Sequence, residues 1–242
     1  MVPHMSLASE TRALAADTLA VMRHPDARGA VLLYTALSAG FFVYALATAG
    51  IGWTLMAAVI GVVMLPVVEF ITHKYVLHWL DLARTSATAQ FWNRVHYAHH
   101  MDPKDTRVIL AHPASVVLLV AVLAAGAWAI GLTPLAPIVA IAFGLFAFYE
   151  IVHFACHMDG EMRSAYFTRR RQEHALHHYI DENRNYGITT AVADRLFGTR
   201  IVDKKALVRS PTARNLGYTG DFADRYPYLK QSEARKDGAD AA

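Results

Sequence analysis

Two long apolar blocks dominate the pattern of hydrophobic and polar positions along the chain. Neither block, 30–68 or 113–149, contains a Lys, Arg, Asp or Glu. Each is too long for one membrane crossing and has the length of two helices of roughly 20 residues. Turn-forming residues mark a reversal near the middle of each block: Gly50 and Gly52 in the first, and Gly131, Thr133 and Pro134 in the second. The pattern predicts an all-α integral membrane protein with about four transmembrane helices in two hairpins.

The basic residues indicate how these hairpins are oriented. All 23 Lys and Arg residues lie outside the two blocks, in 12–28, 74–107 and 163–236. Because two hairpins return the chain to the side that it left, both termini and these three segments share one face of the membrane. The positive-inside rule makes that face cytoplasmic. We therefore expect a multi-pass membrane protein with cytoplasmic termini, in the cell inner membrane if it is bacterial.

Composition narrows the class further. A hydrophobic share of 55%, a charged share of 18% and a mean hydropathy of +0.25 are too apolar for an ordinary soluble fold. The formal net charge is only +3, and the basic residues form no continuous stripe, so nucleic acid is not an expected partner. The single cysteine, Cys156, excludes an internal disulfide and a thiolate cluster. We expect its thiol to be buried packing.

Clustered histidines are the candidate metal ligands. Ten of the 13 histidines fall into four short clusters, two just after each apolar block. Imidazole is the commonest neutral metal ligand, and ten nitrogens exceed the coordination of one ion, so the count favours two metals at the membrane surface. The isolated histidines His4, His24 and His112 receive no role. The predicted ligands are His73, His78, His96, His99, His100, His153, His157, His174, His177 and His178.

The spacing inside the clusters suits helices. At 100° per residue, positions i, i+3 and i+4 fall within about one third of the circumference, so each HxxHH cluster is expected to present three imidazoles to one point. HxxxH does the same for His153 and His157. His73 and His78 are five residues apart and would point about 140° from each other on an ideal helix. That pair needs a helix end, a local distortion or two different metals.

Two carboxylates accompany the clusters where the apolar blocks end. Glu69 lies four residues before His73, and Glu150 lies three before His153. A carboxylate at that depth is costly unless it is paired. Each is a candidate to accept the outer N–H of a ligand imidazole; direct ligation and a side chain facing water stay open. Arg169–Arg171 are expected to anchor the chain at the membrane surface, with a substrate clamp as the alternative.

Four segments in this order resemble the fatty acid hydroxylase superfamily of integral-membrane di-metal oxygenases: EFITHKYVLH, VHYAHHMDPKDTR, YEIVHFACH and QEHALHHYIDENRNYGITTAVADRLFGT. The resemblance covers about residues 69–199. The ending, with NYGIT and DRLFGT, is most similar to the fatty acyl 2-hydroxylase branch. Two departures are a spacing from Pro103 to Arg107 that is one residue short, and Ala193 where an aromatic residue often precedes the Asp of the last motif.

The resemblance implies a helical membrane domain whose cytoplasmic cap holds two iron ions. It further implies O2-dependent hydroxylation of an unactivated C–H bond in a fatty acyl or sphingolipid-type chain. Histidine sites also bind zinc, so purified protein can carry that metal instead. A separate reductase or ferredoxin-type protein is the expected electron donor. Other branches of the superfamily stay open as alternatives, namely carotenoid ring hydroxylases and sterol desaturases or methyl oxidases.

The segment 183–199 is expected to close over the metal site. Within it, Asn185 and Asp194 are candidates to support the ligand imidazoles. For Asp194 three roles are open: accepting an N–H from a ligand histidine, pairing with an arginine, or capping a short surface helix.

Three regions are expected along the chain: an N-terminal cytoplasmic or interfacial segment (1–28), the hydroxylase-like membrane domain (29–207) and an irregular cytoplasmic tail (208–242), disordered beyond Leu229. The first is either an amphipathic helix ending at Pro25 or a frayed tail. A histidine-rich metal transporter or a membrane haem protein is the alternative from another class. Either would place its ligands inside the spans, and the apolar blocks contain no histidine.

Overall fold

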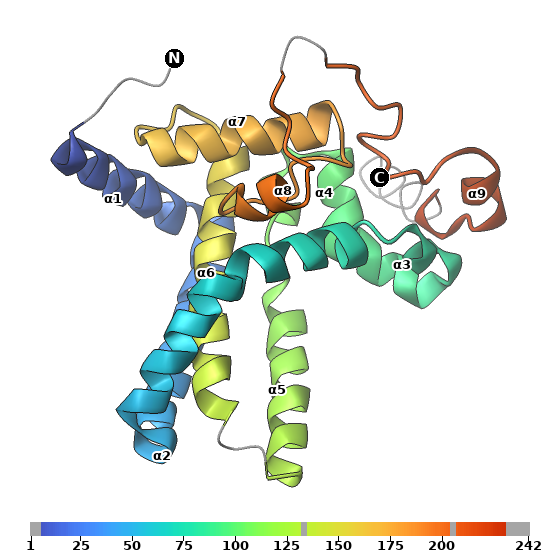
Figure 1. Cartoon of the computed structure of the whole chain (residues 1–242). Helices are drawn as coiled ribbons and strands as arrows, with labels where there is room; N and C mark the ends of the chain where they lie inside the picture. Colours follow the sequence, from blue (N-terminus) through green and yellow to red (C-terminus); the bar gives the residue numbers. More distant parts are fainter. Residues whose placement is uncertain (1–5, 132–134, 204–206, 231–242) are drawn as a thin grey trace.

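The computed structural model of the chain describes residues 6–131, 135–203 and 207–230, and these residues form helices, turns and loops without a β-strand. Figure 1 shows a stem of long helices beneath a wider cap. The stem consists of α2 (Pro25–Ile71), α5 (Pro113–Ala129) and α6 (Ala136–His157). The cap helices are α1 (Leu7–Arg23), α3 (Ser86–Trp92), α4 (Ala98–Met101), α7 (Ala165–Tyr179), α8 (Val192–Leu196) and α9 (Gly220–Arg225).

Short helices of other pitch join these elements. Two are π-helices, η1 (Thr72–Leu77) and η3 (Asn93–Tyr97), and each holds at least one clustered histidine. Two are 3-10 helices, η2 (Leu80–Arg84) and η4 (Thr106–Val108).

α2 consists of two helical arms that meet at Gly50. The backbone there has φ 78° and ψ 166°, and Figure 1 shows the chain descending along one arm and returning along the other. Glycine adopts a positive φ without steric cost, so the reversal falls where the sequence predicts it. At the second expected turn, Gly131 also has a positive φ (73°), while Thr133 and Pro134 lie outside the described residues.

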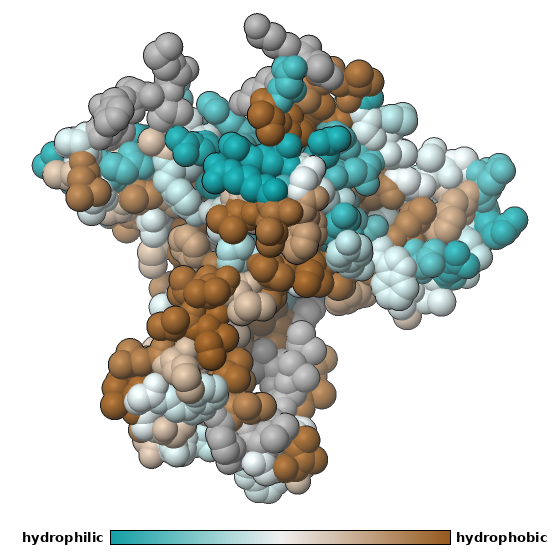
Figure 2. All heavy atoms as spheres, in the orientation of Figure 1, coloured by the Kyte–Doolittle hydropathy of each residue, from teal (hydrophilic) through white to brown (hydrophobic). Residues whose placement is uncertain are grey.

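Helices α2 and α6 pack closely against each other, and the stem has an apolar outer surface. Between α2 and α6, the Phe41 and Phe143 rings stack at 5.8 Å, and Ser38 donates a hydrogen bond to the Ala140 carbonyl at 2.9 Å. Outward-facing side chains include Val59 and Val63, 64% and 67% exposed, and Figure 2 shows hydrophobic residues covering much of the stem. Within the described residues, the stretches 25–84 and 136–157 are long and apolar enough to cross a membrane.

Within the N-terminal segment, residues 7–23 form a helix. Ser6 caps α1 by accepting from the Ser9 amide at 3.2 Å, and the helix ends at Arg23, before Pro25 opens α2. Its buried residues are Ala13, Asp17 and Val21, which share one helical face. α1 therefore packs on the rest of the cap through a face that includes Asp17.

The segment after residue 207 packs against the cap as far as Leu229. Leu216, Tyr218, Ala223 and Leu229 form a hydrophobic cluster with Trp92 and its neighbours. Trp92 in turn donates its indole N–H to the Leu77 carbonyl at 2.6 Å. An irregular tail was expected here because the sequence shows only turns and mixed charge. The expected disorder beyond Leu229 falls largely on 231–242, outside the described residues.

Candidate metal centre

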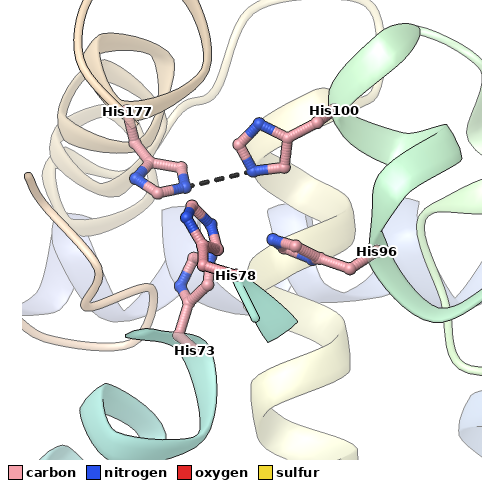
Figure 3. Close-up of side chains that lie close together, drawn as sticks. All are labelled: His73, His78, His96, His100 and His177. Atoms are coloured by element: carbon pink, nitrogen blue, oxygen red, sulfur yellow. Dashed lines mark hydrogen bonds between the residues drawn. The ribbon is translucent and has the colours of Figure 1, made fainter. Parts of the chain in front are cut away.

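The structure brings all ten clustered histidines together as two adjacent groups of five. The first group comprises His73, His78, His96, His100 and His177; the second comprises His99, His153, His157, His174 and His178. In each group, one nitrogen from every ring lies within 4.8 Å of the others. Figure 3 shows the first group converging from three separate segments, with a 3.2 Å contact between the Nε2 atoms of His177 and His100.

The expectation that each HxxHH cluster serves one point is wrong. Each cluster is divided: its i and i+4 histidines join one group, and the histidine between them joins the other. His96 and His100 thus lie in the first group with His177, whereas His174 and His178 lie in the second with His99. On a helix, positions i and i+4 are about 40° apart, while i+3 and i+4 are about 100° apart. The two groups are therefore interlocked through α4 and α7.

A local distortion places His73 and His78 in the same group. The backbone from Thr72 to Leu77 is a π-helix, and the His78 amide donates to the His73 carbonyl at 3.1 Å, an i to i+5 bond. The wider turn brings position i+5 over position i, and the two ring centroids are 4.9 Å apart. Among the arrangements left open by the sequence, the structure shows this one.

Backbone carbonyls hold the outer nitrogens of three imidazoles in the first group. The Nδ1 atoms of His73, His177 and His100 lie 2.6, 2.7 and 3.2 Å from the carbonyl oxygens of Tyr186, Arg184 and Ala213, respectively. A carbonyl can only accept, so each Nδ1 carries the proton and each Nε2 offers its lone pair to the centre.

The inner nitrogens fit a metal. Among the described residues, the Nε2 atoms of His73, His78, His96 and His157 are buried without a hydrogen-bond partner. Burial lowers the pKa of His177 to about 4. Burial first, and then neighbouring imidazoles, also lower the pKa of His96 and His174 well below the usual value. Neutral imidazoles with unsatisfied inward lone pairs are the donor set that a divalent transition metal requires.

The candidate carboxylates do not touch the imidazoles. Glu69 accepts hydrogen bonds from the Ile188 amide and from Thr189, whose amide is 2.8 Å away and whose hydroxyl is 2.5 Å away. Glu150 accepts from the Ala111 amide at 3.4 Å. The imidazole bond that was one candidate role for each carboxylate is not formed, because a backbone carbonyl takes that role for His73 and the carboxylates accept from loop backbone instead.

Asp194 also holds backbone. Its carboxylate accepts from the amides of Tyr186 and Gly187, at 2.9 and 2.7 Å, and from the Thr199 hydroxyl at 2.6 Å. None of the three roles considered from the sequence, with a histidine, an arginine or a helix cap, matches these bonds. Asp194 fixes the loop whose Tyr186 carbonyl holds His73, so it acts on that imidazole through one intervening peptide.

Asn185 completes the same loop. It adopts a positive φ of 52°, which Asn tolerates better than most residues. Its side chain donates to the Glu173 carbonyl at 3.1 Å and accepts from the Ile201 amide at 2.8 Å. Tyr186 and Ile188 are almost fully buried. The segment 183–199 closes over the histidines, as expected.

α1 positions α7, a contact that the sequence analysis did not identify. Asp17 accepts hydrogen bonds from the amides of Arg163 and Ser164, and Glu10 accepts from those of Ala165 and Tyr166, all at 2.8–3.1 Å. These amides precede or open α7, and a helix N-terminus favours negative charge. α1 thereby fixes the helix that carries three of the ten histidines.

Two of the three expected surface arginines are internal to the cap. Arg171 donates to the carbonyls of Ala155, Met158 and Gly160, at and just after the C-terminal end of α6. Arg170 is buried and pairs with Glu173 at 2.5 Å. Arg169 is exposed. The membrane-anchor interpretation is wrong for Arg170 and Arg171, because their guanidinium groups pair with polar atoms of the cap.

The second group borders a cavity. A space of about 270 Å³ lies beside His157, lined also by Lys104, Cys156, Arg171 and Tyr179. His157 and His78 are half-buried, whereas the other eight clustered histidines are buried. Cys156 is buried, as expected.

A helical fold with two buried five-histidine groups and an apolar stem is typical of membrane metalloproteins. The sequence profile of the fatty acid hydroxylase family matches residues 58–199, more than half of the chain. The chain belongs to this family.

Curated relatives match more than half of this chain. The chain is 26% identical over 141 residues to the dihydroceramide fatty acyl 2-hydroxylase FAH2 of Arabidopsis thaliana, covering 57% of this chain and 58% of the relative. It is 27% identical to the ceramide very long chain fatty acid hydroxylase scs7 of Schizosaccharomyces pombe, covering 58% and 41%, and 24% identical to the fatty acid 2-hydroxylase of Macaca fascicularis, covering 61% and 40%. The matches thus span less than two thirds of each relative's length.

A solved structure shares the fold. The chain superimposes on the hydroxylase domain of scs7p with a TM-score of 0.59 and 20% identity, covering 71% of this chain and 65% of that one.

Proposed function

We propose that this protein is a membrane-bound, O2-dependent lipid hydroxylase that inserts a hydroxyl group into an unactivated C–H bond of a fatty acyl or sphingolipid-type chain. One observation carries the proposal: ten histidines form two adjacent groups whose ring nitrogens converge within 4.8 Å. The family, and relatives whose names specify fatty acyl or ceramide hydroxylation, support the lipid class of the substrate.

Two iron ions are the proposed cofactor, one in each histidine group. Bound there, iron would supply the redox chemistry that couples O2 reduction to hydroxylation of the C–H bond. The protein's own groups orient the imidazoles and exclude water. Backbone carbonyls at residues 184, 186 and 213 fix three imidazoles, and the buried loop 185–189 excludes water from the first group. A separate reductase or ferredoxin-type protein is the proposed electron donor, and zinc can occupy the same ligands in purified protein.

The proposed topology has four spans, formed by the two arms of α2 and by α5 and α6. The reversal at Gly50 and the apolar outer surface of the stem support it. Every Lys and Arg lies outside the apolar blocks, so both termini and the cap are proposed to be cytoplasmic. The proposed membrane domain is 29–207, flanked by 1–28 and 208–242, and residues 216–229 contribute to the cap.

Lipid mass spectrometry with 18O2 tests the function. Membranes from expressing cells should contain a hydroxylated acyl lipid carrying one 18O atom, and the product should be lost in the His177→Ala variant. His112→Ala is the matched control, because His112 is an exposed histidine outside both groups. Label in a carotenoid or sterol would assign another branch of the superfamily, and no labelled lipid with a fully loaded protein would refute the proposal.

A further inference from the structure

Helix α8 combines a buried face that holds the site with an outer face that is apolar. Ala193 and Asp194 are 1% exposed and point inward. Val192, Leu196 and Phe197, at and just after the helix, are 53%, 69% and 50% exposed. Three large apolar side chains on so short a segment are costly in water, and a cluster of this kind marks an interaction surface.

This surface continues the apolar surface of the stem. Phe197 stacks on Phe70, near the end of α2, with ring centroids 4.7 Å apart. Beyond Phe70, the neighbouring side chains Ile71, Tyr75 and Val76 are 48%, 59% and 44% exposed. Figure 2 shows hydrophobic atoms rising from the stem to the underside of the cap, below a hydrophilic band on the cap itself.

The charged and aromatic residues at this boundary suit a lipid headgroup region. Lys74 lies over the rings of Phe70, Tyr75 and Tyr186, at 5.1–5.7 Å from their centroids. Arg195 is exposed on α8 beside Leu196. Tyr and Trp are enriched at membrane interfaces, and long basic side chains there extend their charge into the headgroups. Trp79, 54% exposed, follows η1 on the same stretch of chain.

We propose that the outer face of α8, formed by Val192, Leu196 and Phe197, lies in the interfacial layer of the lipid bilayer together with Tyr75 and Val76 of η1. The occupant of this surface is lipid, because the surface is continuous with the stem and bounded by Lys74 and Arg195. The inference rests on the proposed membrane topology. This placement sets the bilayer close to the first histidine group through a chain of ring contacts. Phe197 stacks on Phe70, and the ring centroids of Phe70 and Tyr186 are 5.4 Å apart. The Tyr186 ring centroid in turn lies 5.6 Å from that of His73.

Nitroxide depth measurements on the full chain in phosphatidylcholine vesicles test this placement. Single cysteines are introduced at Leu196, Val63 and Val208 in a Cys156→Ala background and spin-labelled. Val63 is 67% exposed on the stem. Val208 is the matched control, because it is 84% exposed and its segment lies on the side of the cap away from the stem in Figure 1.

The Leu196 label should collide with lipid-soluble oxygen and lose most of its collisions with a water-soluble nickel chelate, while the Val208 label keeps both. A Leu196 label as accessible to the chelate as Val208 would overturn the inference, as would one shielded from both probes, which indicates a protein contact. If the Val63 label also reports water, the membrane topology itself fails. A second label at Val192 repeats the measurement if the Leu196 variant does not fold.

Discussion

The two histidine groups contain the same number of imidazoles, yet the chain builds them differently. The second group takes two i, i+4 pairs from the regular helices α6 and α7, plus His99 of α4. The first depends on irregular backbone: a π-helix under His73 and His78, another through His96, and loop carbonyls on three outer nitrogens. Among the described residues, the outer nitrogens of His99, His174 and His178 have no hydrogen-bond partner. Helix geometry therefore sets the second group, and the loops set the first.

Removing one ligand from each group is the strongest test of whether the groups are separate metal sites. The wild type should bind about two ions, and His96→Ala and His174→Ala should each lose one ion and all measurable turnover, because both positions are needed for the reaction. Metal analysis of purified protein with a lipid product assay measures both effects. His112→Ala should retain both ions. Loss of both ions from either variant would mean that the groups are one cooperative centre.

Gly187→Ala should damage the first group selectively. A Cβ at this position would collide with the Thr190 carbonyl and lie 2.8 Å from the Asp194 carboxylate, so the loop that presents the Tyr186 carbonyl must shift. Misplacing such a partner typically costs 10- to 100-fold in metal affinity or activity. Competition with a chelator should show weaker binding at one of two sites. Gly52→Ala, with nothing within 4 Å of its added Cβ, is the control.

Asp194→Asn should have a smaller effect of the same kind. The carboxylate accepts three hydrogen bonds, and an amide must turn its NH2 group toward one of those donors. A buried donor left without an acceptor costs about 1–3 kcal/mol. We expect a lower Tm and weaker metal binding in the first group, with the second unchanged. Weakening of both groups alike would show that the loop supports the whole cap.

The contrast between helix geometry and loop contacts also explains which features could be predicted from the sequence. All ten histidines, the helical class and the reversal at Gly50 follow from local spacing and hydropathy, which a sequence displays directly. The allocation of His99 and His177 to opposite groups does not, because it depends on how α4 and α7 face each other. Nor do the carbonyls of Arg184, Tyr186 and Ala213, since every residue has a carbonyl and only the fold selects which one meets an imidazole.

The carboxylates also show that the sequence can identify a residue without identifying its partner. Glu69 and Glu150 were singled out as charges in an unfavourable place, and Asp194 as a candidate to support an imidazole, yet all three accept from backbone amides, and Glu69 and Asp194 also from threonine hydroxyls. Any carboxylate beside a histidine cluster suggests an imidazole contact. The loop that competes for Glu69 is more than a hundred residues away in the chain.

The contact of α1 with α7 offers the mildest perturbation, and one that should not distinguish the groups. Glu10 and Asp17 accept from four amides at the start of α7. Because α7 gives His177 to the first group and His174 and His178 to the second, loosening it should affect both. In the double variant Glu10→Gln, Asp17→Asn, the loss of charge at a helix N-terminus should cost about 1 kcal/mol of stability. Both ions should remain bound at saturating metal, with a Tm lower by a few degrees. Thermal unfolding with parallel metal analysis measures this. Selective loss of one ion would show that α1 orients a particular histidine, because a uniform shift of α7 cannot favour one group.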